Sequence, residues 1–402
     1  MSFLSHDVVQ FLVRLPESMA KTNPPKKRYT LAEVLDILDA DNPSAIISNI
    51  SVVPEPENNA HDTDCDSDFS DDDVTSYNTV PRRRLLWSDD DDVSNISIKE
   101  AMRRNRFNEI MASIHVVDNM NITADPFFKV RPLFEELSEV NKTMPIQKYL
   151  SVDEMMIEYF GRHGCKQFIR GKPIRFGYKI WSLTSSAGFV YQMEPYAGSH
   201  TRLVETGLGQ GPSVVLGLAE NAGVPPGCKF YHDNLFTTLS LVDEMTRRGY
   251  GSCGTMRENQ LFAVPLTPAK MFQKTSRGDA EYLVEDGKLI VRWNDNSVVT
   301  VVSNMEKEYS EVKTQRWNKQ KHAMDKVKQP TCIKDYNTHM GGVDLHDQCV
   351  NRYRISIRSK KWWWPCYSWA LNSAMVNSWF YYRYMKLCAI EGCDAHMLFI
   401  LT

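Results

Sequence analysis

Four aspartates have the residue type and the surroundings for chemistry on phosphate groups: Asp153, Asp233, Asp344 and Asp347. Asp153 lies near the start of a predicted strand, and Asp233 ends another. Asp344 and Asp347 are three residues apart and would share one face of a helix that opens at Val343. Carboxylate oxygens suit Mg²⁺, which takes one or two protein carboxylates per ion. Two such ions about 3.5–4 Å apart can activate a nucleophile and stabilise the leaving oxygen in phosphoryl transfer.

Each of these aspartates also has a purely structural interpretation. Asp153 could be an exposed or turn residue beside Glu154, and Asp233 could cap the helix that follows it. Asp344 could cap its own helix, and Asp347 could be a solvated neighbour on that helix. The spacings of 80 and 111 residues between the first three aspartates form no local motif. The residues alone therefore leave a metal site and a structural role both open.

The spacing of apolar residues predicts the elements that must position these side chains. A helical period predicts helices over 29–39, 96–117, 127–140, 212–222, 236–248, 333–357 and 366–387. β-type runs predict strands over 155–160, 178–185, 189–195, 227–233, 282–284, 289–293 and 297–302, with a hairpin turn at 185–188. Strands that alternate with helices predict an α/β fold with a β-rich insertion.

Charge divides the chain into an acidic head and a basic body. The formal net charge is −3, yet residues 1–100 hold 20 Asp and Glu against 9 Lys and Arg, a net of −11. Residues 101–402 hold 30 acids and 38 bases, a net of +8. Residues 54–73 have nine acids and no base, so we expect them to be disordered, either as a solvated linker or as a shield for the basic body. This asymmetry indicates a domain that binds a polyanion.

Composition excludes several other classes of protein. The chain is 42% hydrophobic and 11% aromatic, which is enough for a real core. No stretch approaches the roughly 20 apolar residues that span a bilayer, so no membrane association is expected. The N-terminus has neither the basic region nor the clear cleavage site of a signal peptide. The nine scattered cysteines are therefore expected to be reduced thiols of an intracellular protein.

Several sequence words, taken in order, resemble the piggyBac transposase family, specifically its domesticated transposable element-derived members. The resemblance runs from about residue 81 to about 385. Its words are Pro81-Arg-Arg-Arg-Leu-Leu-Trp87, Ala101-Met-Arg-Arg-Asn-Arg-Phe107, Ser151-Val-Asp-Glu154, the segment from Tyr159 to Lys179, His232-Asp-Asn-Leu-Phe-Thr237, Arg292-Trp-Asn-Asp-Asn-Ser-Val-Val299, Tyr336-Asn-Thr-His-Met-Gly-Gly-Val-Asp344 and Arg358-Ser-Lys-Lys-Trp362.

The resemblance implies an RNase H-like catalytic core, a mixed sheet flanked by helices, with a β-rich insertion. It assigns the three catalytic and metal-binding positions to Asp153, Asp233 and Asp344, and a fourth acidic position of the site to Asp347. The implied cofactor is Mg²⁺ or Mn²⁺. The implied activity is metal-assisted cleavage at transposon ends followed by strand transfer into target DNA, with a preference for TTAA sites. The implied partner is double-stranded DNA, a homodimer is allowed, and the implied location is the nucleus.

The resemblance and the composition together predict five regions. They are an acidic, largely disordered region over 1–80 with one short helix, a helical DNA-binding and dimerisation remnant over 81–150, a catalytic core over 151–260 and 330–360, a β-rich insertion over 261–329, and an aromatic-rich helical segment over 361–402.

Two departures from the family pattern bear on function. The longer helical region that usually precedes the word at Pro81 is short here, because the acidic stretch runs almost directly into it. Members commonly end in a cysteine-rich zinc domain, whereas the last two cysteines here, Cys388 and Cys393, lack CxxC spacing. A structural zinc needs four ligands, so we predict no zinc. The departures put recognition of transposon ends in question.

Two basic runs are candidate DNA contacts. Residues 312–334 carry seven Lys and Arg against one acid, and residues 351–361 carry five and no acid. Either run could equally be a solvated face, although DNA binding through them would depend strongly on salt. The candidate DNA-binding residues are Lys172, Arg175, Arg352, Arg354, Arg358, Lys360 and Lys361.

Aromatic and histidine side chains near the motifs have simpler interpretations. The aromatic cluster of Trp362, Trp363, Trp364, Trp369, Trp379 and Phe380 could stack on bases, but we expect it to be helix core. Histidine is a less natural Mg²⁺ ligand than carboxylate, so His163, His232 and His346 are left out of the metal shell.

Three functions compete at this point. The first is a DDE-type transposase or nuclease whose acidic set is intact and whose activity is latent. The second is a domesticated protein that holds DNA or chromatin without turnover. A carboxylate-pair hydrolase such as a glycosidase is a weaker third hypothesis, because the basic runs and the motifs that resemble the piggyBac family disfavour it.

Overall fold

The computed structural model describes residues 10–11, 29–30, 86–89, 95–120, 122–170, 172–261, 264–318, 322–352, 354–355, 357, 359 and 361–391. The chain divides into two compact units, Met1–His115 and Val116–Thr402. The predicted disorder of the acidic region falls outside the described residues. Of the predicted helix over 29–39, only Tyr29 and Thr30 are described, and they form a strand.

Within the described residues, the first unit has two short strands and two short α-helices. Strand β1 (Gln10–Phe11) pairs antiparallel with β2 (Tyr29–Thr30). The helix predicted over 96–117 is two helices, α2 (Ile96–Ala101) and α3 (Arg104–Ser113), because Met102 is fully extended with φ of −164°. The Trp87 indole donates to the Met102 carbonyl over 2.8 Å and packs on Phe107, which joins the two helices.

The second unit is built on one mixed sheet of nine strands. Along the sheet the order is β4, β5, β3, β7, β8, β11, β10, β9, and β6 pairs with β5 on the edge that faces away from β3. The bounds are β3 (Tyr149–Glu158), β4 (Gln167–Phe168), β5 (Phe176–Ser185), β6 (Val190–Pro195), β7 (Lys229–His232), β8 (Gly251–Thr255), β9 (Ala280–Glu285), β10 (Lys288–Asn294) and β11 (Val298–Ser303). Strands β3, β7 and β8 are parallel to one another, and the remaining pairs are antiparallel.

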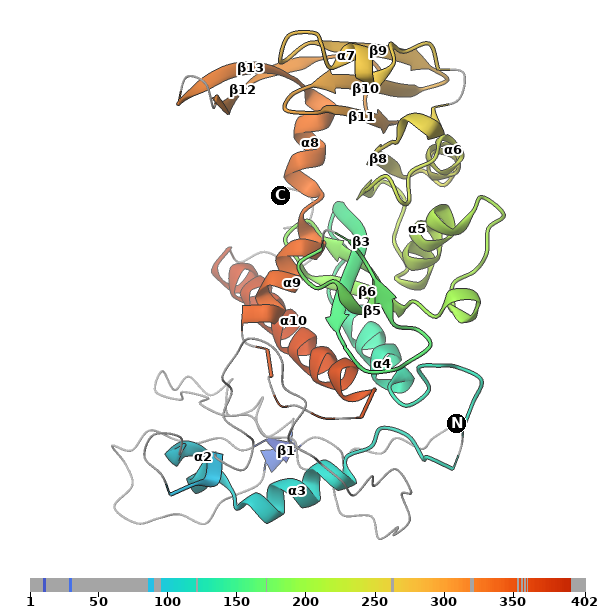
Figure 1. Cartoon of the computed structure of the whole chain (residues 1–402). Coiled ribbons are helices and arrows are strands. Elements are labelled where there is room, and N and C mark those ends of the chain that lie inside the picture. Colours follow the sequence, from blue (N-terminus) through green and yellow to red (C-terminus); the bar gives the residue numbers. More distant parts are fainter. Residues whose placement is uncertain are drawn as a thin grey trace. The chain divides into compact units, whose positions relative to one another are not determined.

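Seven α-helices of this unit connect or cover the strands (Figure 1). Their bounds are α4 (Arg131–Asn141), α5 (Gln210–Asn221), α6 (Leu239–Arg247), α7 (Ala269–Phe272), α8 (Thr331–His339), α9 (Gly342–Arg352) and α10 (Trp364–Glu391). A second, two-stranded ribbon is formed by β12 (Glu311–Asn318) and β13 (Ala323–Pro330). The predicted mixed α/β architecture is confirmed at this level.

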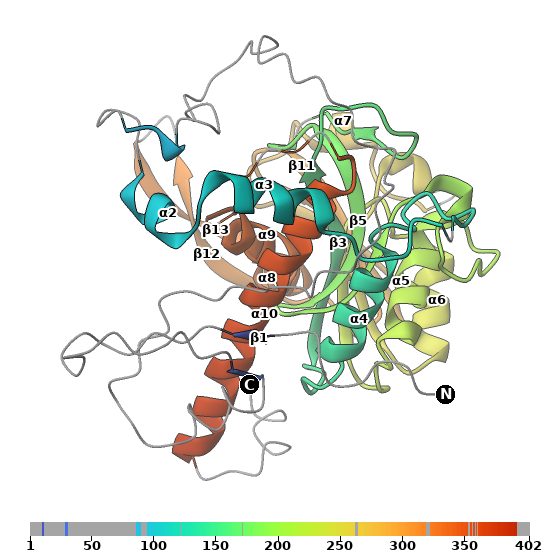
Figure 2. The same ribbon diagram turned by 90° about the horizontal axis from the view of Figure 1, so that it is seen from below.

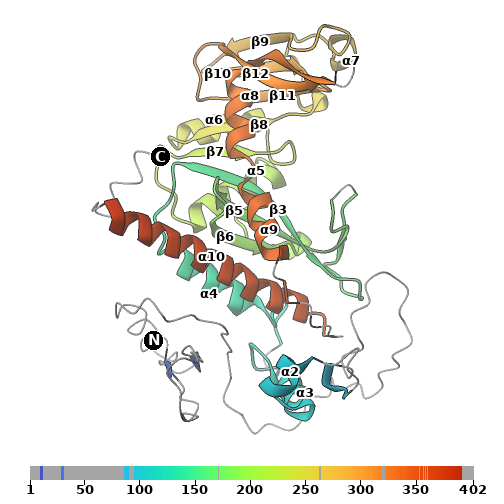
Figure 3. The ribbon, with the colours of Figure 1, turned by 90° about the vertical axis from the view of Figure 1, so that its left-hand side faces the viewer.

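The two faces of β3 carry different helices because successive residues of a strand point to opposite faces. Leu150 and Val152 belong to the core cluster that holds the apolar residues of α5 and α6. Ser151, between them, donates from its hydroxyl to the Met340 carbonyl at the end of α8 over 2.6 Å. Helices α5 and α6 therefore cover one face, and α8 and α9 the other (Figure 2). Helices α10 and α4 run side by side (Figure 3).

Some predicted elements were wrong in extent. The helix predicted over 333–357 is interrupted at Met340 and Gly341, which separate α8 from α9. Strand β8 was missed, because its small residues have no apolar alternation, and it is buried in the middle of the sheet. No individual strand is predicted for the ribbon of β12 and β13, although it falls almost entirely within the predicted β-rich insertion over 261–329, because the lysines of its exposed face hide the strand pattern.

The aromatic segment at the C-terminus is mainly core, as predicted. Trp363, Trp364 and Trp369 are at most 6% exposed. Trp362 stacks on His163 with ring centroids 4.3 Å apart, and Trp379 stands out at 48% exposed. Within the described residues, no helix is both long and apolar enough to pass through a membrane.

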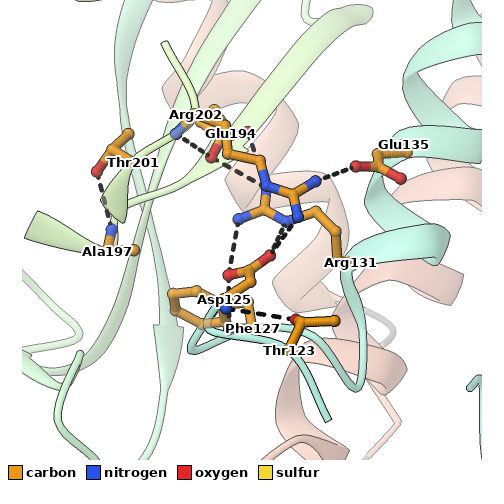
Figure 4. Close-up of polar contacts among 9 residues, drawn as sticks. All are labelled: Thr123, Asp125, Phe127, Arg131, Glu135, Glu194, Ala197, Thr201 and Arg202. Carbon is orange, nitrogen blue, oxygen red and sulfur yellow. Dashed lines mark hydrogen bonds and ion pairs between the residues drawn. The ribbon is translucent and has the colours of Figure 1, made fainter. Parts of the chain in front are cut away.

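A buried ion network fastens α4 to β6 (Figure 4). Arg131 is 4% exposed; its Nε donates to Asp125 Oδ2 over 2.6 Å, and its Nη1 donates to both oxygens of Glu194 over 2.9 and 3.0 Å. Arg202 adds ion pairs to Asp125 and Glu135. Burial alone would raise the pKa of Asp125, but the hydrogen bonds from Arg131 and the Phe127 amide, together with the charges of Arg131 and Arg202, lower it. Arg131 is thus the charge that lets two carboxylates remain buried.

Replacing Arg131 by methionine should therefore strongly reduce the stability of the fold. Arg131→Met keeps most of the volume but leaves Asp125 and Glu194 buried without their shared partner, so we expect a loss of about 3–5 kcal/mol in the free energy of unfolding. Urea denaturation of purified protein measures it. Arg247→Met is the control, because Arg247 is 71% exposed in a surface pair with Glu244 and should change stability by less than about 1 kcal/mol. Equal effects of the two substitutions would contradict the role given to the network.

Candidate active site

The parallel pairing of β3 with β7 brings Asp153 and Asp233 to the same edge. The last residues in register are Val152 and His232, and each is followed directly by one of the aspartates. Both strands run in the same direction, so the carboxyl end of β7 lies beside the middle of β3. Asp153 is inside β3 rather than near its start, since β3 begins at Tyr149. Topology thus unites two residues that are 80 positions apart in the sequence.

Asp233 shapes the turn that follows β7. Its Oδ1 accepts from the Leu235 amide over 2.8 Å, and its backbone carbonyl accepts from the Thr237 amide and hydroxyl over 3.1 and 2.7 Å. The alternative role as a helix cap is wrong, because α6 begins at Leu239 and is capped by Thr238. Gly211 at the start of α5 lies against this turn, where a Cβ would come within 2.3 Å of the Leu235 carbonyl oxygen.

A buried histidine supports the turn from behind. His232 is fully buried, its Nδ1 lies 2.7 Å from the Thr237 hydroxyl, and its Nε2 lies 2.9 Å from the Ser252 hydroxyl. Burial lowers the pKa of His232 to about 3, so the ring is neutral. Gly254 on β8 makes room for it, since a Cβ there would be 2.5 Å from Nδ1. Both ring nitrogens are engaged by protein hydroxyls, which is a structural role.

Helix α9 brings Asp344 and Asp347 to the same region from the far end of the sequence. Its first residue, Gly342, is buried against β5, where a Cβ would lie 2.1 Å from the Ser185 carbonyl oxygen. His346 fixes the next turn, with Nδ1 2.9 Å from the Gly188 carbonyl and Nε2 2.9 Å from the Ser373 hydroxyl of α10. Burial lowers the pKa of His346 to about 4. Asp344 is exposed and Asp347 half-buried.

Lys172, in the loop before β5, is the cation of this acidic region. Its Nζ lies 3.9 Å from Asp153 Oδ2 and 3.6 Å from Glu154 Oε1. Burial would lower the pKa of Lys172, but Asp153, Glu154, Asp344 and Asp233 together raise it. Carboxylates from β3, β7 and α9 therefore act on one ammonium group. The predicted contact of Lys172 with DNA stays a prediction, and its visible partners are acids.

A pocket of about 600 Å³ opens between β3, Lys172 and the helices α8 and α9. Its lining includes Glu154, Lys172, Asp344 and Asp347. Two carboxylate oxygens there, Glu154 Oε2 and Asp347 Oδ1, are buried and accept no hydrogen bond in the described part of the chain. Because a buried acceptor without a partner is costly, these oxygens indicate a missing cation or donor. Sequence reasoning missed Glu154 as a candidate, although it directly follows Asp153.

Three carboxyl groups of the site, those of Asp153, Asp233 and Asp347, have raised pKa values. Burial, reinforced by the charge of Glu154, raises the pKa of Asp153 well above its usual range. Burial and the charge of Glu154 also raise the pKa of Asp233, although the Leu235 amide opposes the shift. Burial and the charge of Asp344 raise the pKa of Asp347 to about 6. Such mutual repulsion in a partly dry site is relieved when a divalent cation binds.

By chemistry, these residues fit a hard divalent cation. The donors are carboxylate oxygens, two of them orphaned, as Mg²⁺ and Mn²⁺ prefer. By geometry they form no closed shell: among the described residues no group of three His, Cys, Asp or Glu side chains is arranged to hold a metal. The acidic residues are therefore assembled in one region while Lys172 balances part of their charge.

The other candidate DNA contacts are spread around the pocket. Arg175 is exposed beside Lys172, and Arg352 is exposed in the last turn of α9. Arg354 pairs with Glu158 at the end of β3, Nη2 to Oε2 2.7 Å. Lys361 is half-buried, with its ammonium 5.3 Å from the centre of the Trp363 ring. Arg358 and Lys360 lie outside the described residues, as does Cys393 of the zinc argument.

Comparison with known proteins gives consistent matches. Residues 74–379 match the model of a family described as transposase IS4. The human piggyBac transposable element-derived protein 3 is 40% identical over 311 residues, which are 76% of this chain and 52% of that protein. The human piggyBac transposable element-derived protein 2 is 33% identical over 318 residues, 77% of this chain and 53% of that protein. The chain thus spans about half the length of the curated relatives it matches.

A solved structure supports the fold independently. The cryo-EM structure of a piggyBac transposase synaptic complex with hairpin DNA matches with a TM-score of 0.62 at 21% identity. The match covers 77% of this chain and 62% of that chain. At this identity the likeness concerns the fold alone.

The close approach at Gly342 gives a test of how α9 is positioned. In Gly342→Ala the new Cβ would meet the Ser185 carbonyl oxygen, so we expect α9 to shift and the free energy of unfolding to fall by about 1–3 kcal/mol. Chemical denaturation measures the loss. Gly341→Ala is the matched control, because nothing lies within 4 Å of a Cβ at that position and its effect should stay within about 0.5 kcal/mol.

The raised pKa of Asp347 predicts how stability depends on pH without metal. Because the folded-state pKa is about 6 and the unfolded value is lower, the folded state loses stability as pH rises through 6. Asp347→Asn removes this loss, so at pH 8 in EDTA the variant should be more stable than the wild type by about 1–3 kcal/mol. The difference should disappear below about pH 4, where both side chains are neutral. A difference that does not change with pH would contradict the assignment.

Proposed function

Because this chain belongs to the piggyBac-type transposase IS4 family, we propose that it binds double-stranded DNA and cleaves and rejoins it by metal-dependent phosphoryl transfer. The observation that carries the proposal is the assembly of Asp153, Asp233, Asp344 and Asp347 from three separate elements around Lys172. A fold that only needed stability would not bring four acids into one half-buried region, because their repulsion is unfavourable. The chain covers half of its relatives, so the activity of the whole protein is part of the proposal.

We assign the metal to Asp153, Asp233 and Asp344, with Asp347 as the fourth acid of the site. Mg²⁺ or Mn²⁺ held there would lower the pKa of an attacking water or 3′-hydroxyl and stabilise charge on the leaving oxygen. The protein's own contribution is orientation: the Leu235 amide holds Asp233, and the close packing at Gly342 holds α9. The mixed sheet around β3, with helices on both faces, supports the RNase H-like assignment of the core.

DNA binding is proposed on the basic side of the same region. The residues proposed to contact phosphates are Lys172, Arg175, Arg352, Arg354, Arg358, Lys360 and Lys361. Arg175 and Arg352 are exposed and belong to the two segments that flank the pocket, which supports this assignment. A TTAA target, a homodimer and a nuclear location remain parts of the proposal that rest on the family.

A catalytically silent DNA-binding protein is the second candidate. The specific observation in its favour is Lys172, whose ammonium already offsets part of the charge of Asp153 and Glu154. A resident cation competes with a metal for the same carboxylates. This candidate retains the basic surface and the fold but not the turnover.

Nicking of supercoiled DNA in Mn²⁺ distinguishes the two candidates. The wild type should nick the plasmid, and Asp233→Asn or Asp153→Asn should reduce the rate by about 100-fold or more, the scale of removing a group that stabilises charge in an active site. Asp243→Asn is the control: Asp243 lies on α6, is 58% exposed and pairs with Lys288, so its loss should leave the rate unchanged. If the protein binds DNA in a salt-sensitive way but does not nick it in any divalent metal, the enzymatic proposal is wrong and the catalytically silent DNA-binding protein remains.

A further inference from the structure

Three phenylalanines are exposed together on the hairpin that joins β3 to β5. Phe160, Phe168 and Phe176 are 71%, 58% and 42% exposed. Phe168 and Phe176 face each other across the β4–β5 ladder with ring centroids 4.8 Å apart, and Phe160 lies 6.4 Å from Phe176. We call these three residues the Phe cluster. A single exposed apolar side chain is ordinary, whereas a contiguous aromatic patch marks a binding surface.

The charged side chains of the segment that carries the Phe cluster are all positive. The segment from Phe160 to Phe176 contains five Lys and Arg and no Asp or Glu. Arg162, Arg170 and Arg175 are exposed, and none of them forms an ion pair within the described part of the chain. A neutral apolar partner would leave these guanidinium groups unmatched. The surface therefore complements a partner that offers both negative charge and flat rings.

The same hairpin leads directly to the acidic pocket. Lys172, Pro173 and Ile174 line that pocket, and Arg175 and Phe176 are the next two residues along the chain. The Ile169 amide donates to the Arg175 carbonyl over 2.9 Å, which holds the two arms of the hairpin in register. A strand that lies across the Phe cluster would thus pass the entrance of the pocket.

We propose that the Phe cluster is a stacking platform for unpaired bases of a DNA strand whose backbone continues into the acidic pocket. Bases within a duplex are stacked on one another, so only unpaired or displaced bases offer their faces to a protein ring. Exposed aromatic rings set among arginines are the surface that single strands bind without sequence preference. The inference rests on the proposed function for its substrate, but it concerns binding rather than cleavage.

Binding measured in EDTA tests the platform apart from catalysis. The probes are a blunt duplex and the same duplex extended by a short single-stranded oligothymidine, with affinity followed by fluorescence anisotropy. The wild type should bind the extended probe more tightly. Phe160→Ala/Phe168→Ala should weaken binding to the extended probe by about 5- to 100-fold and leave the blunt duplex within about twofold, because each stacked base contributes on that scale.

Two further variants separate stacking from folding. Phe168→Trp retains a ring that stacks and should keep the preference for the extended probe. Tyr382→Ala removes an aromatic residue that is 54% exposed on α10, away from the hairpin, and should change neither affinity.

Each alternative outcome overturns the inference in a recognisable way. If the wild type binds both probes with equal affinity, the Phe cluster does not stack on unpaired bases. The same conclusion follows if the double variant loses affinity for both probes equally. Neither result contradicts DNA binding or the proposed function. If the double variant instead abolishes self-association or binding to anionic vesicles and leaves the probes unaffected, the partner is a second copy or a lipid surface. Nicking that fails while the probe preference holds would refute the enzymatic proposal and not this one.

Discussion

Repulsion among carboxylates, balanced by one lysine, is the constraint around which the rest of this unit is arranged. Asp153, Glu154 and Asp233 meet where β7 ends beside the middle of β3, and Asp344 approaches from a helix. Their charges disfavour one another in a half-buried site, which is why the pKa values of Asp153 and Asp233 are raised. The Lys172 ammonium offsets part of that repulsion. A divalent cation would offset more of it with the same oxygens.

Because the acidic region is unfavourable by itself, its surroundings must hold it in place. Neutral buried histidines bind hydroxyls and carbonyls on both sides, His232 behind Asp233 and His346 behind α9. Glycines allow close backbone approach at Gly211 and Gly342. Farther out, Arg131 anchors α4 to β6 through two buried carboxylates. Strain and polarity at the site are thus supported by satisfied polar contacts one layer away.

The hairpin of β4 and β5 links this site to the surface. One of its residues, Lys172, turns inward to the carboxylates, while its phenylalanines and arginines face solvent. One short segment therefore has side chains in the acidic pocket and side chains in solvent. The pairing of Phe168 with Phe176 in the β4–β5 ladder fixes which side chains face each. The position of the Phe cluster beside the acidic pocket follows from strand geometry.

The family could be predicted from an ordered set of sequence motifs. The mixed α/β class and most helices and strands could be predicted from local apolar periodicity. The sequence by itself also singled out the four aspartates, but it left each of them open to a structural role. Only the tertiary structure decided that Asp153 and Asp233 lie side by side, that Glu154 joins them and that Lys172 is their partner. The physical reason is that these neighbours are set by strand register and tertiary packing between residues up to 80 positions apart, and no local pattern encodes that pairing.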